Sequence, residues 1–309
     1  MAACPICPNA EREQTRVVFD VKSDGGVESS WGVKTERALV YECANCGLRF
    51  RTPPEASAVL DFYGQQYHER MVGGVDDVQR ELQHRRENDA RIRYLKLFTA
   101  SGRVLDVGCS LGHLAKQLEQ AGFDVMGSDI SAFACERAER LLGAGKVLHG
   151  PIEGFADRFE GAFDAITMLD VIEHFVDVVA PLTGCLKMLK PSGVLFLRTP
   201  TLSSPFHQIA ELCFRASGGL YRTPILKLYH GEHLFYFNEN SIRRVLERVG
   251  FEVVDVAPDP LLWSNFRSAE LRNGTLVDTA MAVVYFAGRA FKRGHGMRVV
   301  ARRRTDLAQ

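Results

Sequence analysis

The segment from Val104 to Ala115 constrains the fold of this chain more than any other part of the sequence. It consists of an apolar run, a turn with Gly108 and Gly112, and the first turn of a helix. Glycine lets a backbone turn tightly and approach a ligand closely, and the helix that follows directs unpaired N–H groups towards whatever lies above the turn. This order is typical of the nucleotide-binding half of a parallel α/β sheet. It favours a cofactor that contains a nucleoside.

A second apolar run, Val125 to Asp129, ends in an acid about twenty residues after the turn. A carboxylate at this point of a βαβ unit is the usual partner of ribose hydroxyls. The turn from Asp106 to Gly112 has neither the glycine spacing of a pyrophosphate cradle nor the Lys-Ser/Thr pair of a phosphate-binding loop. The amino-acid sequence of the turn therefore indicates which nucleoside cofactor is expected.

Asp106 to Gly112 resembles motif I of the class I methyltransferases that use S-adenosylmethionine (SAM). Later segments continue the resemblance in the order of that family. The ribose motif, the fourth strand and the turn before the fifth strand match residues 127–129, 163–169 and 189–193. Asp170 to His174 further resembles a subgroup with the sequence Asp-Val-x-Glu-His after the fourth strand. Four motifs in order are far more specific than one glycine-rich turn.

The resemblance implies an α/β fold, a Rossmann-like, doubly wound sheet of seven strands. The alternation of apolar runs with helical segments indicates a parallel, doubly wound sheet independently of the family. We expect its strands near 103–107, 123–128, 146–149, 163–169, 194–199, 251–256 and 297–301.

The same resemblance assigns cofactor contacts. Asp129 is expected to bind the ribose diol of SAM, and Leu169 to offer its carbonyl to the methionine ammonium. Ser110 replaces the middle glycine of the family pattern, and we interpret serine as small enough to pass beneath the ligand. The full expected set is Asp106, Gly108, Ser110, Gly112, His113, Asp129, Ile130, Ile152, Glu153 and Leu169.

Methyl transfer from SAM needs an acceptor that is positioned and, where necessary, deprotonated. The run Tyr229 to Phe237 resembles a segment of zinc-containing sugar C-methyltransferases, which implies that Glu232 and His233 form a catalytic pair and that His233 removes the proton. The same resemblance implies that Tyr67, in the connector, corresponds to a tyrosine of the acceptor pocket in those enzymes. A structural hydrogen-bonding role at the sheet edge is the alternative for His233. Further candidate bases are His174, which could instead cap a helix, and His230.

Two Cys-x-x-Cys pairs near the N-terminus resemble a zinc ribbon. We expect strands at 15–21 and 38–42 around a Gly/Ser-rich hairpin, and Gly47 supplies the turn that a zinc knuckle needs. Four thiolates leave no open coordination position, so the zinc is expected to be structural. Removal of zinc is expected to unfold the first fifty residues and to leave SAM binding largely intact. The ligands are Cys4, Cys7, Cys43 and Cys46, whereas Cys109, Cys135, Cys185 and Cys213 are expected in the core.

The chain is expected to have three parts: a zinc-ribbon module (1–52), a helical connector or lid (53–98), and a SAM-dependent methyltransferase domain (99–309). Insertions at 201–238 and 261–295 depart from a minimal fold. Because ligands bind at the carboxyl ends of parallel strands, the first insertion is expected to shape the acceptor pocket. The second contains an apolar helical run with a basic end, for which packing on the core, a peripheral membrane contact and a dimer contact all stay open.

The composition limits the function classes. The formal net charge is 0, which argues against the broad basic surface that nucleic-acid binding requires. The N-terminus has no signal-peptide pattern and the tail no apolar stretch long enough to cross a bilayer, so a cytoplasmic protein is expected.

The preferred interpretation is a SAM-dependent methyltransferase acting on a small or carrier-linked metabolite, above all a sugar or another secondary-metabolite or cell-surface intermediate. Two alternatives stay open. One is a methyltransferase for an rRNA base, because bacterial enzymes of that type also join a four-cysteine zinc module to this fold. The other is a SAM-sensing or scaffold protein without catalysis.

Overall fold

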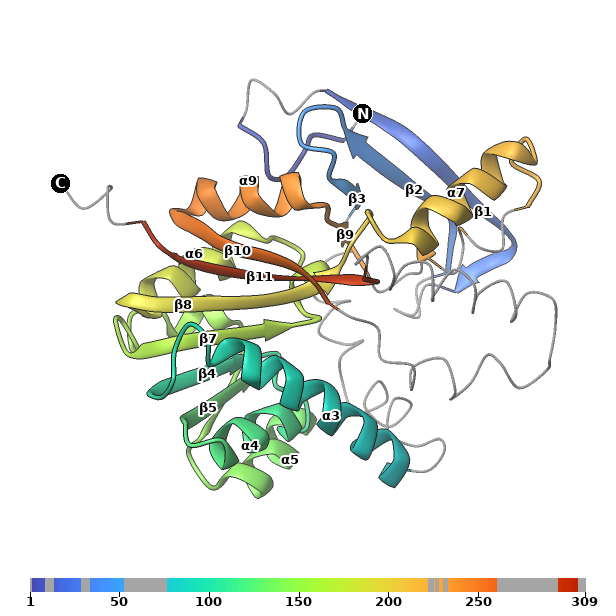
Figure 1. The fold of residues 1–309 in the computed structure, drawn as a ribbon. Helices are drawn as coiled ribbons and strands as arrows, with labels where there is room; N and C mark the ends of the chain where they lie inside the picture. Colours follow the sequence, from blue (N-terminus) through green and yellow to red (C-terminus); the bar gives the residue numbers. More distant parts are fainter. Residues whose placement is uncertain are drawn as a thin grey trace. The chain divides into compact units, whose positions relative to one another are not determined.

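The computed structural model describes residues 2–8, 14–28, 34–52, 77–221, 225, 228–229, 233–259 and 294–304. The chain forms two compact units, whose elements are labelled in Figure 1. The first unit contains residues 1–53, 198–242 and 256–298, and the second contains residues 54–197, 243–255 and 299–309. The N-terminal segment thus shares a unit with residues of both predicted insertions. The three-part division expected from the sequence stays a prediction.

A seven-stranded sheet forms the centre of the second unit, and three of its strands run on into residues of the first. The strands are β4 (Arg103–Val107), β5 (Asp124–Asp129), β6 (Val147–His149), β7 (Phe163–Leu169), β8 (Leu189–Pro200), β10 (Phe251–Asp259) and β11 (Gly296–Arg303). Their order is β10-β11-β8-β7-β4-β5-β6, and β4 pairs in parallel with both β5 and β7. All seven predicted strands are confirmed. The chain order reverses beside β4, and the carboxyl ends of strands at such a switch point are where ligands bind in open α/β sheets.

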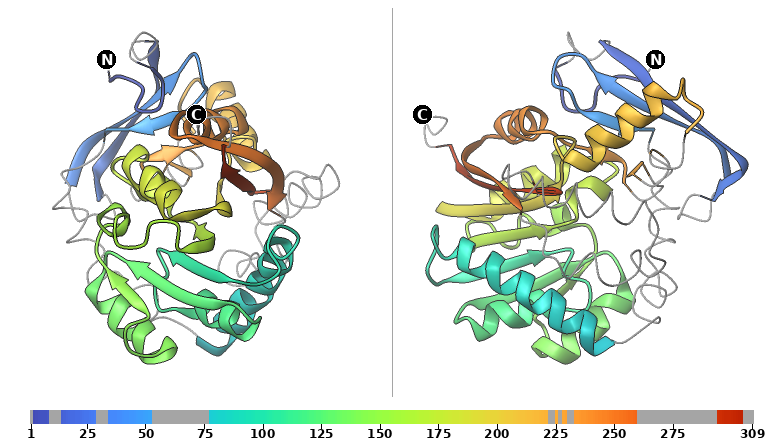
Figure 2. Two further views of the ribbon diagram at one scale, coloured as in Figure 1. Left: turned by 90° about the vertical axis from the view of Figure 1, so that its left-hand side faces the viewer. Right: turned by 45° about the vertical axis from the view of Figure 1, so that its right-hand side comes forward.

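Helices cover both faces of this sheet (Figure 2). They are α3 (Asp77–Leu95), α4 (His113–Gln120), α5 (Ala132–Leu142), α6 (Val179–Met188) and α9 (Glu239–Val249), with short 3₁₀ turns η2 (Ile152–Phe155) and η3 (Ile172–His174). Among the described residues, no helix is both long and apolar enough to cross a membrane.

The strands form because their apolar residues are buried together. Val104, Val125 and Ala165 lie on three neighbouring strands and are fully buried in one cluster with Leu118 of α4. β-Branched residues favour extended backbone, and each fully buried valine or leucine side chain contributes about 1.5–3 kcal/mol. This core fixes the ends of β4, β5 and β7, from which the candidate site is built.

The first unit contains a second sheet of four strands in the order β1-β2-β3-β9. These are β1 (Thr15–Glu28), β2 (Lys34–Cys43), β3 (Arg49–Arg51) and β9 (Phe235–Tyr236). β1 and β2 pair antiparallel, with Thr15 opposite Cys43, so the predicted hairpin is confirmed with longer strands. β9 is not predicted from the sequence; it comes from the predicted insertion at 201–238 and completes the N-terminal sheet.

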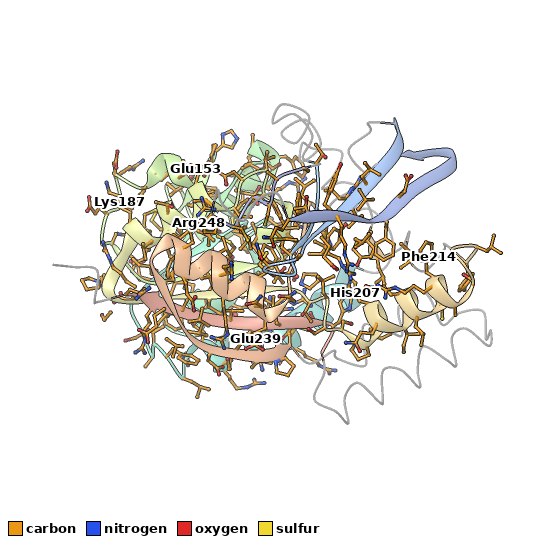
Figure 3. All side chains as sticks on the ribbon, turned by 90° about the horizontal axis from the view of Figure 1, so that it is seen from above. Glu153, Lys187, His207, Phe214, Glu239 and Arg248 are labelled. Atoms are coloured by element: carbon orange, nitrogen blue, oxygen red, sulfur yellow. The ribbon has the colours of Figure 1, made fainter. Side chains whose placement is uncertain are left out.

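The core of the first unit joins the N-terminal hairpin to helix α7 (Pro205–Ala216). The ring of Phe19 in β1 lies 5.5 Å from that of Phe214 and 5.0 Å from that of Tyr229. Figure 3 shows Phe214 and His207 on α7 beside the N-terminal strands. His207 is buried, and burial lowers its pKa to about 3, so it is a neutral core histidine. The N-terminal module therefore buries its apolar residues against the insertion.

Candidate functional site

The turn after β4 adopts the conformation that its glycines predict. Gly108 and Gly112 have φ angles of 69° and 84°. A Cβ atom on Gly108 would lie 2.4 Å from Cγ2 of Val171, so only glycine fits there. The backbone amides of Gly108 and Cys109 both donate to the carbonyl of Ser128, at 2.8 and 3.0 Å. The turn is therefore held at the ends of β4 and β5.

Ser110, at the place of the missing middle glycine, has a φ of 49°. This is the left-handed region, which costs a non-glycine residue roughly 1–2 kcal/mol. The side chain of Ser110 is exposed, so its size meets no obstacle. The serine is tolerated sterically, but at the cost of backbone strain at a place where a ligand is expected.

The carboxylate of Asp129, at the end of β5, ties this turn to the next helix. It accepts hydrogen bonds from the backbone amides of Ser110 and Ser131, both at 2.9 Å. Ser131 in turn caps α5 by accepting a hydrogen bond from the amide of Ala134, at 3.3 Å. A carboxylate can accept about four hydrogen bonds. Asp129 is half-buried, and its carboxylate can accept further hydrogen bonds from the two hydroxyls of a ribose.

Asp106 is buried beneath the same turn, with only 2% of its surface exposed. The hydroxyl of Thr167 donates to its carboxylate at 2.7 Å. Burial raises the pKa of Asp106 to about 7; the Thr167 hydrogen bond opposes this rise and the charge of Asp129 adds to it. A carboxylate in this environment gains from a nearby cation, such as the ammonium or sulfonium of SAM. Thr167 was missed from the sequence, although it lies directly opposite Asp106 in the β4–β7 register.

Asp170 is the second non-glycine residue with a positive φ in the described part of the chain, at 58°. It follows Leu169 at the carboxyl end of β7, next to the end of β4. Strained backbone of this kind concentrates at ligand-binding and catalytic sites. Leu169 was predicted as a cofactor contact, whereas the strain at Asp170 and the close approach of Val171 to Gly108 were not.

The other predicted cofactor residues lie on nearby elements of the second unit. Ile152 is 4% exposed and Glu153 is exposed, both on η2, which packs against α6. Ile130 is half-buried after β5, and His113 is exposed at the first residue of α4. Hydrogen bonds connect the turn to Asp129 and Asp106 to Thr167. Contacts of the four residues above with a cofactor stay predictions.

The catalytic candidates are only partly described. Tyr67, His230 and Glu232 lie outside the described residues. His233 is half-buried before β9, and its carbonyl accepts a hydrogen bond from the hydroxyl of Tyr236 at 3.0 Å. His174 is the half-buried last residue of η3. The roles of all these side chains in catalysis stay predictions.

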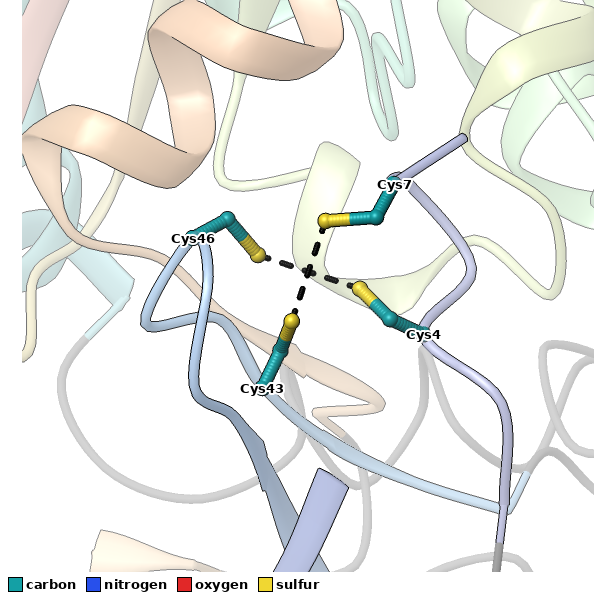
Figure 4. A group of neighbouring side chains, drawn as sticks. All are labelled: Cys4, Cys7, Cys43 and Cys46. Carbon is teal, nitrogen blue, oxygen red and sulfur yellow. Dashed lines mark hydrogen bonds between the residues drawn. The ribbon is translucent and has the colours of Figure 1, made fainter. Parts of the chain in front are cut away.

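The four N-terminal cysteines converge in the first unit (Figure 4). All four are fully buried, and their sulfur atoms lie within 4.8 Å of one another. The Cys4–Cys46 and Cys7–Cys43 sulfur distances are 3.8 and 3.7 Å. Zinc–sulfur bonds of about 2.3 Å in a tetrahedron require edges of about 3.8 Å. The arrangement therefore fits a four-thiolate zinc site.

The backbone of the second Cys-x-x-Cys pair has the form of a zinc knuckle. The amide of Gly47 donates to the carbonyl of Cys43, and the amide of Cys43 to that of Leu48, both at 2.9 Å. Gly47 has a φ of 70°, which confirms the need for glycine.

Arg49 follows the knuckle and is 8% exposed. Its guanidinium donates to the carboxylate of Glu42 at 2.7 Å and also contacts Glu211 of α7 and the hydroxyl of Tyr229. Arg16 of β1 pairs with the same Glu42 at 2.6 Å. The charges of both arginines are therefore balanced within the first unit.

Comparison with known families matches residues 78–256 to the family described as "Methyltransferase domain". A curated relative, the ubiquinone biosynthesis O-methyltransferase of Aromatoleum aromaticum, is 27% identical over 161 residues, which cover 51% of this chain and 67% of the relative. The protein of the same name from Xanthomonas oryzae pv. oryzae is 34% identical over 119 residues, which cover 36% of this chain and 49% of that relative. The chain thus spans from about half to two thirds of these two relatives.

Solved structures share the fold. Magnesium protoporphyrin IX methyltransferase from Synechocystis PCC 6803, with bound SAH, superposes with a TM-score of 0.51 at 19% identity, covering 81% of this chain and all of that chain. A putative methyltransferase in complex with the Trm112 activator of Haloferax volcanii gives a TM-score of 0.55 at 14% identity, covering 77% of this chain and 95% of that chain. At these identities the likeness concerns the fold alone.

Proposed function

The chain belongs to the methyltransferase-domain family. On that premise we propose that it is a SAM-dependent methyltransferase that methylates a small or carrier-linked acceptor, with a sugar as the first candidate. The observation that carries the donor side is the carboxylate of Asp129, held by the amides of Ser110 and Ser131 at the end of β5. The acceptor side rests on the sequence resemblance and on the balanced charges of the N-terminal module.

The residues around the β4 turn fit SAM. Asp129 would bind the ribose hydroxyls, and the backbone of Gly108 to Gly112 would lie against the methionine part. Asp106, kept in place by Thr167, would stabilise the positive charge of the donor. When bound, SAM supplies a methyl group on a sulfonium, which needs no further activation. The chain itself therefore has to orient the acceptor, exclude water and remove a proton.

We propose that His233 accepts the proton from the acceptor atom and that Glu232 orients it. Tyr67 is proposed to line the acceptor pocket, and His174 is kept as a second candidate base. The two curated relatives compared above are named as O-methyltransferases, so a hydroxyl oxygen is the acceptor atom to test first. Their matched segments do not cover the whole chain, so the relatives' names guide only this choice of acceptor atom, and the acceptor molecule is proposed from the sequence of this chain.

We propose zinc as the ion of the four-cysteine site, in a structural role. The sulfur spacing supports it, and four buried thiolates leave no coordination position for a substrate. We propose a cytoplasmic location, because cysteine thiols stay reduced in the cytoplasm and can bind a metal there. The proposed membrane or dimer contact of the C-terminal helical run concerns residues outside the described part.

An rRNA base as acceptor is the less favoured candidate. Arg16 and Arg49 of the N-terminal module are paired with Glu42 and Glu211. Arginines that already have carboxylate partners gain little from phosphates, whose binding depends on free cationic side chains. The zero net charge of the chain points the same way.

The test is to incubate the full-length, zinc-loaded protein with SAM and three separate acceptor sets: nucleotide-sugars, ubiquinone-biosynthesis intermediates and unmodified rRNA. Formation of SAH together with a methylated nucleotide-sugar is the expected result. Turnover with the quinone intermediates alone would replace the sugar but keep a small acceptor. Salt-sensitive turnover with rRNA alone would overturn the proposal.

A further inference from the structure

Two asparagines after β9 bind the carbonyls of the zinc knuckle. The side-chain amide of Asn238 donates to the carbonyl of Gly47 at 2.9 Å, and that of Asn240 donates to the carbonyl of Cys46 at 3.1 Å. The amide nitrogen of Asn238 lies only 2.5 Å from the place of a Cβ on Gly47, so the contact leaves no spare room. The backbone of a predicted metal ligand is thus attached directly to the start of α9.

β3 gives a second connection between the knuckle and the same segment. It begins three residues after Cys46 and pairs antiparallel with β9, with Arg49 opposite Tyr236. The amide of Arg51 also donates to the carbonyl of Leu234 at 2.9 Å. β9 has two residues, and a strand this short has no stability without a partner. In the described sheet, β3 is the neighbour of β9.

These contacts lead to His233. Burial raises the pKa of Tyr236, and a hydrogen bond with Arg51 opposes the rise, so the phenol stays neutral and donates. Its hydroxyl binds the carbonyl of His233 at 3.0 Å. The route from the knuckle through β3 to His233 therefore consists of backbone pairing followed by two side-chain hydrogen bonds.

Asn238 has two separable functions. Its side-chain oxygen accepts a hydrogen bond from the backbone amide of Ser241 at 2.8 Å. Its backbone amide donates to the Ser241 hydroxyl at 2.9 Å, and together these two bonds cap the first turn of α9. Its side-chain nitrogen alone binds Gly47. An aspartate at this position keeps the cap and replaces the nitrogen with an oxygen that faces the Gly47 carbonyl.

We propose that the four-cysteine site positions residues 233–241, so that metal binding in the N-terminal module sets the placement of His233, with Arg51, Asn238 and Asn240 as positioning residues. This inference rests on the proposed function, in which His233 acts on the acceptor. It assigns the metal a part in acceptor-side geometry, whereas the β4 turn and Asp129, in the second unit, do not depend on it.

Hydrogen–deuterium exchange of the full-length protein tests this, with Zn²⁺ present or removed by a chelator. Removal is expected to accelerate exchange by at least about fivefold in residues 34–52 and also in residues 233–241. Exchange in residues 103–129 and the calorimetric affinity for SAH are expected to change by less than about twofold. Unchanged exchange at 233–241, while 34–52 becomes fast, would overturn the proposal, and so would an equal loss of SAH affinity.

The variant Asn238→Asp tests the link with the metal still bound. Faster exchange at 233–237 with an unchanged zinc content is the expected result, and slow exchange there would contradict the proposal. Asn88→Asp is the matched control, because the Asn88 amide donates to Gln117 at 2.8 Å in the second unit. This readout does not use turnover: if exchange responds as expected but His233→Ala is fully active, the positioning stands and only the proposed base is wrong.

Discussion

The carboxylate of Asp129 and the backbone amide of Ser110 lie 2.9 Å apart and join the end of β5 to the turn after β4. The bond links the residue expected to bind the cofactor's ribose to the turn expected to lie beneath its methionine part. The donor site is therefore one connected structure rather than two independent motifs.

We predict that Asp129→Ala weakens SAH binding by about 10- to 100-fold, because hydrogen bonds to a charged group contribute roughly 1.5–3 kcal/mol. Isothermal titration calorimetry of the purified protein measures this change. Asp124→Ala is the matched control, since Asp124 lies at the other end of β5 with 67% of its side chain exposed. Equal affinity of the Asp129 variant and the wild type would remove Asp129 from the site.

Ser110 provides a test of backbone strain. Ser110→Gly is expected to raise the free energy of unfolding or leave it unchanged, because glycine adopts a φ of 49° without penalty. Ser110→Val is expected to lower it by about 1–2 kcal/mol, since a β-branched residue resists this conformation. Urea unfolding measures both, with the exposed Ser101→Val as control. A stable Ser110→Val variant would show that the turn adopts another conformation.

The pKa of Asp106 predicts a pH dependence. Its folded-state pKa is raised to about 7 by burial, above the unfolded value of about 3.9. The unfolded chain therefore loses this proton first, and the stabilisation present at low pH is lost as the pH rises from about 4 to 7. SAM affinity has the opposite trend, because the ionised carboxylate attracts the cationic donor. In Asp106→Asn, the free energy of unfolding and the SAM affinity should each differ less between pH 5 and pH 7.5 than in the wild type. Urea unfolding and calorimetry at the two pH values measure these differences. Differences as large as in the wild type would mean that another group titrates.

The seven-stranded sheet could be predicted because each strand is a local apolar run and the motifs fix their order. The Asp106–Thr167 hydrogen bond could not, since it depends on the register between β4 and β7, which the sequence alone does not fix. Once the strands are paired, Thr167 follows as the residue opposite Asp106. Asp170 begins the Asp-Val-x-Glu-His motif, but its positive φ could not be predicted, because the sequence of the motif does not show the backbone conformation.

The relation between the N-terminal module and the insertion was hidden for a different reason. β9 has two residues, too few for an alternation pattern. The Arg49–Glu211 pair and the Asn238–Gly47 bond join residues far apart in sequence. The cysteine spacing, in contrast, was sufficient to predict the cluster, because two Cys-x-x-Cys pairs have few other structural uses.

Metal content gives a further prediction. The protein as purified is expected to contain one zinc ion per chain, and Cys43→Ser is expected to lose it. Substitution with Co²⁺ should give the absorption bands of a tetrahedral four-thiolate site. Cys213→Ser, which changes a half-buried cysteine outside the cluster, should keep both properties. Full zinc retention in the Cys43 variant would contradict the proposed ligand set.

The proposed catalytic role of His233 predicts a separation of turnover from donor binding. In His233→Ala the rate of acceptor methylation should fall by about 10²- to 10⁴-fold, the usual contribution of a general base. Its affinity for SAH should stay the same. His149→Ala, an exposed histidine at the end of β6, is the control. Turnover at the wild-type rate would leave His174 or His230 as the base to test next.

A crystal structure of the full-length protein with SAH tests the central claim most directly. The account predicts the ribose hydroxyls within hydrogen-bonding distance of the Asp129 carboxylate, with the homocysteine part against the backbone of Gly108 to Gly112. Density for SAH at another place, or a turn that stays empty at saturating SAH, would contradict it.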